Sequence, residues 1–289
     1  MSAAFVIASF EDYLSIVRNE LPNGRIYFRG QSKLVSDGYQ LQPSIGRYKR
    51  LESISLFERD QLERDALGVF TNHLLTYVRH LPRNDWEALA IAQHHGLPTR
   101  FMDWTTNPLV ALYFAARETR SDDRGAPMDS AVYVLTSEPA RFSELGRPTD
   151  GAIKPVADSL TAPASPTSSY EGFGVDDHGE EEIDSAPTAG AERRAQWFSP
   201  FEIRENVIYD PPHVTPRIRA QDGVLMACHQ PMQSLEESDY LEIVIKHAAH
   251  DDIRRRLDQY GVFDKQLFPD LDGIAKWLKY RVFEINGKC

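Results

Sequence analysis

The sequence lacks the features that mark several specialised classes of protein. Its two cysteines, Cys228 and Cys289, provide neither a disulfide framework nor a Cys-x-x-Cys pair for zinc. No run approaches the roughly 20 apolar residues that a membrane span requires. Residues 1–10 have no basic stretch ahead of an apolar one, so they do not resemble a signal peptide. These absences predict a cytoplasmic protein without membrane contact.

Common nucleotide and metal motifs are missing as well. No Gly-x-Gly-x-x-Gly follows a predicted strand, no phosphate-loop pattern occurs, and there is no His-Glu-x-x-His pair. We therefore expect no metal. Hydrophobic residues make up 42% of the chain and charged residues 26%, which excludes collagen-like and wholly disordered proteins. A chain of 289 residues can bury a sizeable core without metals or disulfides.

Basic residues are absent from residues 155–191. This segment holds eight acids, so it carries -8 of the net charge of -11 and leaves -3 for the rest of the chain. It is rich in Pro, Ala, Ser and Gly, and burial cannot offset the entropy cost of ordering it. We predict a disordered acidic insertion, with a regulatory or autoinhibitory arm as the alternative. The total charge argues against a general nucleic-acid binder, but the near-neutral remainder leaves room for an anionic ligand.

Apolar periodicity and capping residues predict several helices. Ser9 suits the start of a helix over 9–20, Asn84 that of a helix over 84–95, and Asn107-Pro108 that of a buried helix. Three more helices are expected over 51–80, 250–260 and 270–282. The core residues expected from the first of these are Phe57, Ala66, Val69, Phe70, Leu74 and Tyr77. The last is expected to carry Leu271, Ile274, Leu278 and Val282 as an apolar face.

Branched and aromatic residues predict strands between these helices. The expected strands cover 25–30, 130–136, 206–209, 223–228 and 241–246. A long helical stretch inserted between strands indicates an α+β fold and not a doubly wound α/β fold. We predict one domain over 1–289, with a central mixed or antiparallel sheet and a helical insertion, interrupted by the acidic loop.

Two adjacent histidines lie in the densest polar cluster, between two apolar helices. On a helix His94 and His95 point about 100° apart, so they suit proton transfer or hydrogen bonding better than shared metal binding. A histidine that ends the helix or fills a core niche is the structural alternative. Polar groups in such a place need partners or a function.

Asp103 and Thr105 follow in the same cluster. Asp103 could accept N–H groups at the start of the next helix or orient Arg100. Thr105 could cap that helix or present its hydroxyl to a cleft, where the helix N-terminus favours an anion.

Arg29 ends a predicted apolar strand and is followed by Gly30 and Gln31. An arginine that leaves a buried strand is costly unless it meets an anion. Its planar fork suits a carboxylate or a diphosphate. Gly30 would let a ligand approach the backbone closely. An ion pair with an internal acid is the structural alternative.

Three stretches of the sequence resemble one known family. They are Phe28-Arg29-Gly30-Gln31 with Leu41-Gln42-Pro43-Ser44-Ile45-Gly46-Arg47, the central stretch from Trp86 to Arg100 and from Asp103 to Ala115, and Arg217 to Val224. This combination is similar to the FRG-domain family, which is named after its Phe-Arg-Gly tripeptide. The resemblance covers residues 26–115 and resumes after the acidic segment, which is not part of the family pattern.

A weaker resemblance links the same residues to arginine–serine–glutamate-type ADP-ribosyltransferases. Arg29 with Gly30 resembles their first motif, and the stretch from Asp103 to Ala115 resembles their second, a hydroxyl-rich strand that leads into a helix. Their third motif carries a glutamate near a later strand, where this sequence has Gln221-Asp222-Gly223 and no glutamate. This resemblance implies a split central sheet and NAD as substrate.

The resemblance implies a toxin or defence effector that breaks the nicotinamide–ribose bond of NAD. ADP-ribose would pass to a protein, a nucleic acid or water, and a cognate inhibitor or antitoxin would be a further partner. The candidate catalytic residues are His94, His95, Asp103 and Gln221. The candidate cofactor-binding residues are Arg29, Gly30, Gln31, Arg100 and Thr105. The alternatives are a non-catalytic nucleotide- or protein-binding module, and a nuclease that uses the paired histidines.

Overall fold

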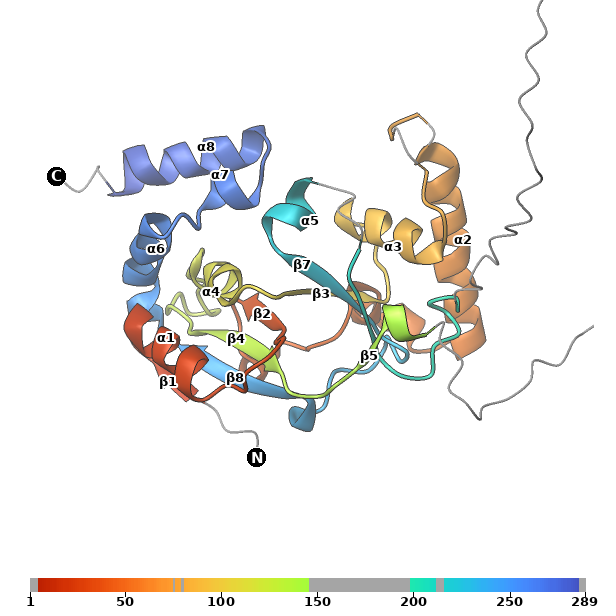
Figure 1. The fold of residues 1–289 in the computed structure, drawn as a ribbon, viewed down its shortest axis with the longest axis horizontal. Coiled ribbons are helices and arrows are strands. Elements are labelled where there is room, and N and C mark those ends of the chain that lie inside the picture. Colours follow the sequence, from red (N-terminus) through yellow and green to blue (C-terminus); the bar gives the residue numbers. More distant parts are fainter. Residues whose placement is uncertain (1–4, 75, 79–80, 146–197, 212–215, 286–289) are drawn as a thin grey trace, which may run out of the picture. The chain divides into compact units, whose positions relative to one another are not determined.

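An eight-stranded sheet organises the protein, which is described here by a computed structural model (Figure 1). The structure describes residues 5–74, 76–78, 81–145, 198–211 and 216–285. The strands, in spatial order, are β1 (Phe5–Ile7), β8 (Tyr240–Ile245), β4 (Ser130–Leu135), β2 (Phe28–Gln31), β3 (Phe101–Thr105), β7 (Gly223–Ala227), β6 (Val207–Tyr209) and β5 (Ala140–Arg141). The outermost pairs, β1–β8 and β5–β6, are parallel and the others are antiparallel. This mixed sheet with separate helices confirms the α+β fold class.

The sheet narrows at its centre, between β2 and β3. These strands share a single paired position, Phe28 with Thr105. Beyond that pair, β2 continues only along β4, and β3 continues only along β7. Two half-sheets therefore diverge from one junction.

Helices surround the sheet, and most of them begin and end near the predicted bounds. They are α1 (Phe10–Asn19), α2 (Leu56–Leu74), α3 (Asp85–His94), α4 (Pro108–Ala116), α5 (Pro216–Ala220), α6 (His250–Gln259), α7 (Asp264–Leu267) and α8 (Leu271–Lys279), which continues as a wider π-helical turn over Tyr280–Ile285. The predicted caps are confirmed: Ser9 accepts from the Asp12 amide, Asn84 from the Glu87 amide and Asn107 from the Leu109 amide.

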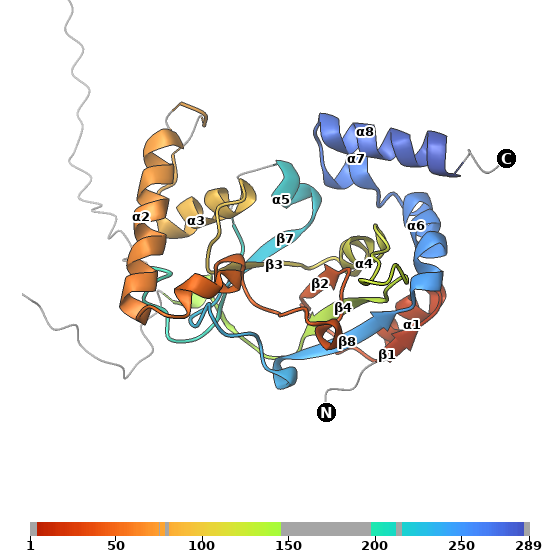
Figure 2. The same cartoon turned by 180° about the vertical axis from the view of Figure 1, so that it is seen from behind.

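Each half-sheet has its own helical cover (Figure 2). Helix α4 packs on β2 and β4, and α1 and α6 complete an apolar core around it. Helix α3 packs on β3, and its Trp86 meets the rings of Phe101 and Tyr209 in a second core. Helix α2 lies against α3. The junction of the half-sheets therefore falls between α3 and α4.

The expected core side of α2 was wrong in part. Leu74 is buried as expected and Phe70 packs at the edge of a core, but Phe57, Val69 and Tyr77 are 77%, 61% and 84% exposed, and Glu63 and Leu67 are buried in their place. The physical reason is an ion pair. Glu63 binds the buried Arg100, so the face of α2 that carries Glu63 is turned toward the protein interior. Hydrophobic periodicity cannot reveal a helix that is oriented by a buried charge.

The apolar face of α8 is exposed. Leu271, Ile274, Leu278 and Val282 are 82%, 37%, 45% and 50% exposed. The helix contacts α7 through Gly273, which is buried. Its apolar stripe was correctly placed at helical spacing, but the described residues provide no partner for it.

Two further sequence predictions concern the environment of the chain. None of the described helices combines the length and the hydrophobicity that crossing a membrane would need. The acidic segment 155–191 lies outside the described residues.

Gly30 sets how closely α4 approaches β2. A Cβ atom built on Gly30 would lie 1.8 Å from the carbonyl oxygen of Ala111. Both groups are backbone, so neither can rotate away. The absent side chain of Gly30 is therefore required by the packing of α4 on the sheet.

We expect Gly30→Ala to lower the free energy of unfolding by ~1–3 kcal/mol, because α4 must move away from β2 to make room for the added methyl group. The matched control is Gly68→Ala in α2, where a Cβ meets no atom within 4 Å. The control should stabilise the protein by about 0.5–1 kcal/mol through helix propensity. Urea unfolding of both variants measures the difference, and equal stabilities would contradict this role of Gly30.

A buried histidine joins α6 to β4. The His250 ring lies 2.8 Å from Thr119 Oγ1 through Nδ1, and 2.8 Å from Ser130 Oγ through Nε2. Burial and the nearby Arg254 lower the pKa of His250 from its usual 6.5, against the opposing charge of Asp129. The folded state therefore holds this ring neutral where the unfolded chain would protonate it.

The free energy of unfolding should fall as pH drops below about 6.5, since the unfolded state then binds a proton that the folded state refuses. Urea titrations at pH 7.5 and 5.5 should show this loss in the wild type. His250→Gln, which does not titrate, should show a smaller loss over the same window. An unchanged pH dependence in the variant would count against His250 as the source.

Candidate functional site

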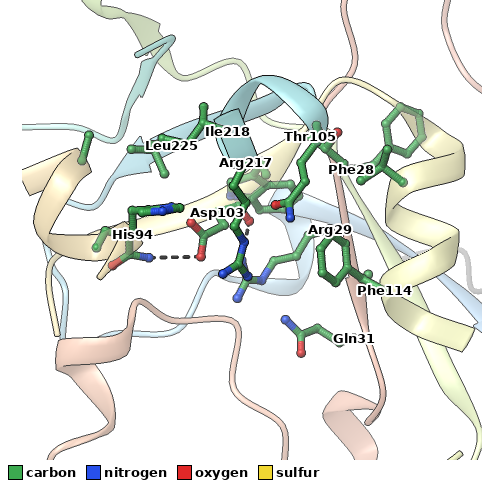
Figure 3. A pocket seen from close by; sticks show the side chains of 16 residues that line it. Phe28, Arg29, Gln31, His94, Asp103, Thr105, Phe114, Arg217, Ile218 and Leu225 are labelled. Carbon is green, nitrogen blue, oxygen red and sulfur yellow. Dashed lines mark hydrogen bonds between the residues drawn. The ribbon is translucent and has the colours of Figure 1, made fainter. Parts of the chain in front are cut away.

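A cavity of about 230 Å³ lies where β2 and β3 diverge (Figure 3). Its walls come from β2, α3, β3, α4 and the segment from α5 to β7. The predicted site residues that line it are Arg29, Gly30, Gln31, His94, Asp103, Thr105 and Gln221. His95 and Arg100 are not among its lining residues. The sheet therefore gathers residues from three distant parts of the sequence.

Arg29 bridges the two half-sheets at the edge of this cavity. Continued pairing of β2 with β3 would place the Asp103 carbonyl opposite Gly30, but the strands have separated there. Arg29 Nη1 donates a hydrogen bond to that carbonyl oxygen instead. A side chain thus satisfies a backbone acceptor that the split leaves unpaired.

Tyr39 and Gln31 fix the other atoms of the Arg29 guanidinium. Arg29 Nε donates to Tyr39 Oη at 3.2 Å. With its amide oxygen turned inward, Gln31 accepts from Arg29 Nη2 at 3.1 Å and from Tyr39 Oη at 3.0 Å. Burial alone would lower the pKa of Arg29, but Tyr39 and the Asp103 carboxylate raise it overall. The cavity therefore contains a permanent, fixed cation.

Asp103 is the carboxylate that the described residues place in the cavity wall. Its Oδ2 accepts from Gln93 Nε2 at 3.1 Å. The Gln93 oxygen in turn accepts from Thr99 Oγ1 at 2.7 Å, so the amide cannot turn over without losing that bond. No described residue donates to Asp103 Oδ1, so one carboxylate oxygen remains available to a ligand.

The rings of the paired histidines lie edge to face with 5.0 Å between their centres, but only one of the two residues lines the cavity. His94 lines the cavity, while His95 ends α3 as an exposed residue with its ring 6.3 Å from that of Phe70. Burial, then His95 and Arg217, lower the pKa of His94 from 6.5, and Asp103 opposes this effect. A neutral His94 imidazole can accept a proton or a hydrogen bond at neutral pH.

Thr105 holds the loop that precedes β7. Its hydroxyl donates to the Gln221 carbonyl at 2.7 Å and accepts from the Asn107 amide at 3.0 Å. Asp222 has a positive φ of 45°, and Asn107 Nδ2 donates to its carboxylate at 3.1 Å. Because the Thr105 hydroxyl is occupied on both sides, it positions Gln221 and has little capacity left for a ligand.

Arg217 and Gln93 are cavity residues to which the sequence analysis gave no role. Both lie inside the stretches that resemble the family, so their motif positions were the available signal. The Arg217 guanidinium stacks on Phe268, 4.6 Å from the ring centre, and makes no ion pair among the described residues. It therefore supplies a second cation to the cavity without a committed anion.

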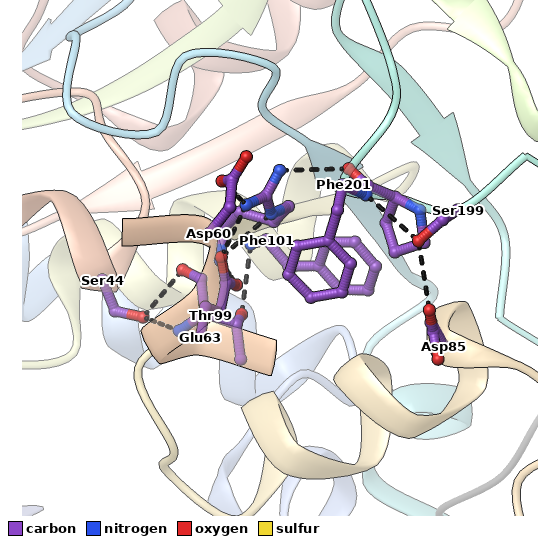
Figure 4. A network of polar contacts seen from close by, with 10 residues as sticks. Ser44, Asp60, Glu63, Asp85, Thr99, Phe101, Ser199 and Phe201 are labelled. Atoms are coloured by element: carbon purple, nitrogen blue, oxygen red, sulfur yellow. Dashed lines mark hydrogen bonds and ion pairs between the residues drawn. The ribbon is translucent and has the colours of Figure 1, made fainter. Parts of the chain in front are cut away.

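Arg100 does not line the cavity and belongs to a buried polar network, whose members Asp60 and Glu63 are labelled in Figure 4. Its side chain is 2% exposed, and its Nε donates to Glu63 at 2.9 Å. The guanidinium also binds Asp60 and the Pro200 carbonyl, and lies 4.3 Å from the Phe201 ring centre. Burial raises the pKa of Glu63 in spite of Arg100. The network ties α2 to the start of β3 and to the chain after residue 197.

The cavity combines cations with one carboxylate and a neutral histidine. Arg29 and Arg217 suit an anionic group, and Asp103 suits a developing positive charge. Within the described part of the chain, no three His, Cys, Asp or Glu side chains gather in a way that would hold a metal ion.

Comparison with known families bears on one part of the chain. Residues 24–124 match the family model of the FRG domain, which confirms the sequence resemblance over that segment. No curated protein and no solved structure matches the chain. The matched residues include β2, α3, β3 and α4, whereas Arg217 and Gln221 lie beyond them.

Arg100→Met should destabilise the protein by about 3–5 kcal/mol, because it leaves the buried Glu63 without its partner. The matched control is Arg64→Met: Arg64 stacks on the same Phe201 ring at 4.2 Å and makes no ion pair with another described residue. Adding Glu63→Gln to Arg100→Met should recover part of the loss. Thermal and urea unfolding check both statements, and equal effects of the two arginine substitutions would refute them.

Proposed function

We propose that this protein binds NAD in the cavity and cleaves the bond between nicotinamide and ribose, passing ADP-ribose to a macromolecular acceptor or to water. The observation that supports this function is convergence. Arg29 and Thr105 come from the two segments that resemble ADP-ribosyltransferase motifs, and Gln221 comes from the place of the third motif. All three residues line one cavity. A toxin or defence role in a bacterial cytoplasm, checked by a cognate inhibitor, is part of the same proposal.

The size of the cavity suggests how NAD would bind. A volume of about 230 Å³ lies below the ~300–1,000 Å³ of typical ligand sites. Nicotinamide and its ribose would occupy the cavity, and the diphosphate would lie at its rim. Arg29 and Arg217 would hold the diphosphate there, because a guanidinium fork matches phosphate oxygens.

Asp103 is proposed to replace the absent third-motif glutamate. Cleavage moves the electron pair of the glycosidic C–N bond onto the nicotinamide nitrogen and leaves positive charge on the ribose. The free Oδ1 of Asp103 would stabilise that charge. When the acceptor forms its bond to the ribose carbon, it loses a proton, which Asp103 or the neutral His94 takes up.

A non-catalytic nucleotide-binding module remains the alternative, and one observation favours it. No glutamate is among the described residues that line the cavity, and Asp103 belongs to β3 and not to the third-motif loop. The same two cations would then bind a nucleotide without turnover. The nuclease alternative needs both histidines at one site, whereas His95 is not among the lining residues.

We expect the wild type to release nicotinamide from NAD, and Asp103→Asn to lower kcat by about 100-fold or more, as loss of a general base does. Asparagine keeps the oxygen that accepts from Gln93, so folding should be preserved. The matched control is Asp123→Asn at an exposed position outside the cavity. Chromatography of nicotinamide and mass spectrometry of acceptors measure turnover and adducts.

Each outcome decides between the functions. Turnover that depends on Asp103 supports the enzyme. NAD-dependent thermal stabilisation that is lost in Arg29→Lys, without any product, favours the binding module. If NAD causes neither turnover nor stabilisation, with purified acceptors or with lysate, the proposed function is wrong.

A further inference from the structure

The end of α7 contacts two cavity residues from behind. The carbonyl oxygen of Leu267 accepts a hydrogen bond from Gln221 Nε2 at 3.0 Å. The next residue, Phe268, carries the ring on which the Arg217 guanidinium stacks at 4.6 Å. Two adjacent residues therefore hold both polar side chains that the α5–β7 segment contributes to the cavity.

The Leu267 contact decides which end of the Gln221 amide stays free. An amide group has a donating nitrogen and an accepting oxygen. The nitrogen donates to Leu267, and no described residue donates to Gln221 Oε1. Thr105 holds the main chain of Gln221 at the same time. The accepting oxygen is thus the available end, and it suits a ligand hydroxyl.

Phe268 connects Arg217 to a second wall of the cavity. Its ring is 8% exposed and meets the Phe114 ring edge-on, with 6.0 Å between centres. Phe114 itself lines the cavity. A cation that stacks on a buried ring gains more than one that stacks in water. The ring therefore limits where the Arg217 guanidinium can lie.

Helix α8 fixes the position of Phe268 in turn. A Cβ on Gly273 would lie 1.9 Å from the Phe268 carbonyl oxygen, so glycine allows the two backbones to touch. The Gly273 amide donates to the capping side chain of Asp270 at 2.8 Å. The exposed helix at the end of the chain thus has a defined inner contact.

We propose that Leu267 and Phe268 are the positioning element of this cavity, which presents the Gln221 amide oxygen and the Arg217 guanidinium to the substrate. The ribose hydroxyls and diphosphate of NAD would be the groups they meet, and for that identity the proposal rests on the proposed function. The positioning itself is a property of the free protein, so it is testable without substrate.

The first experiment follows the Gln221 side-chain amide by nuclear magnetic resonance, with its signals assigned by their loss in Gln221→Glu. Gly273→Ala should push Phe268 and Leu267 away and speed hydrogen exchange of the Gln221 NH₂ group by about tenfold, the factor that corresponds to about 1.4 kcal/mol of lost protection. The control is Phe283→Leu, at a 73% exposed position near α8. Exchange that is unchanged in folded Gly273→Ala, or equally faster in the control, would overturn the proposal.

The second experiment measures NAD cleavage. Phe268→Leu should raise KM about 3- to 10-fold with little change in kcat, and Phe268→Tyr, which keeps the ring, should retain the wild-type KM. Combined with Arg217→Met, Phe268→Leu should add little, because both act through one contact. Additive effects would contradict the proposal. If the wild type cleaves no NAD, the proposed function fails, while the exchange experiment still decides the positioning.

Discussion

The structure depends on the point where β2 and β3 separate. A sheet that continued through this region would pair every backbone group and leave no room for a site. Here one pair, Phe28 with Thr105, holds the halves together, and the freed Asp103 carbonyl needs another donor. Arg29 supplies that donor. The separation of the strands therefore accounts for both the opening in the sheet and the positive charge beside it.

The Phe-Arg-Gly tripeptide can be understood from this junction. Phe28 takes part in the last strand pair and packs in the core beneath α4. Arg29, pointing the other way on the strand, spans the gap. Gly30 lets the α4 backbone approach. The three consecutive residues therefore have different roles. Phe28 joins the half-sheets, Arg29 places a positive charge in the cavity, and Gly30 allows α4 to pack on the sheet. Exchanging the residues would lose all three roles.

Local patterns predicted the three capped helices and five of the eight strands, because spacing and cap chemistry are properties of short stretches. They did not predict β1, β3 and β5. The motifs also indicated most of the cavity residues. They could not separate Arg100 from Arg29: both are arginines beside apolar strands, and only the fold shows that Glu63 meets the first. Nor could the motifs distinguish His94 from His95. His94 is the last residue of α3 and lines the cavity, whereas His95 follows the helix and is exposed. The contacts at the end of α7 could not be predicted from the sequence. One of them is made by the backbone carbonyl of Leu267, a group that every residue has.

The boundaries of the family match have a consequence for how the chain folds. Residues 24–124 supply β2 and β3, but β2 pairs with β4 and β3 with β7, which both come later in the sequence. At the far edge, β1 pairs with β8, joining residues 5–7 to 243–245. Such distant pairings must wait until most of the chain has left the ribosome, and they slow folding because long loops close late. The block that matches the family model is therefore not an independent folding unit. An excised 24–124 fragment would expose two unpaired strand edges to aggregation.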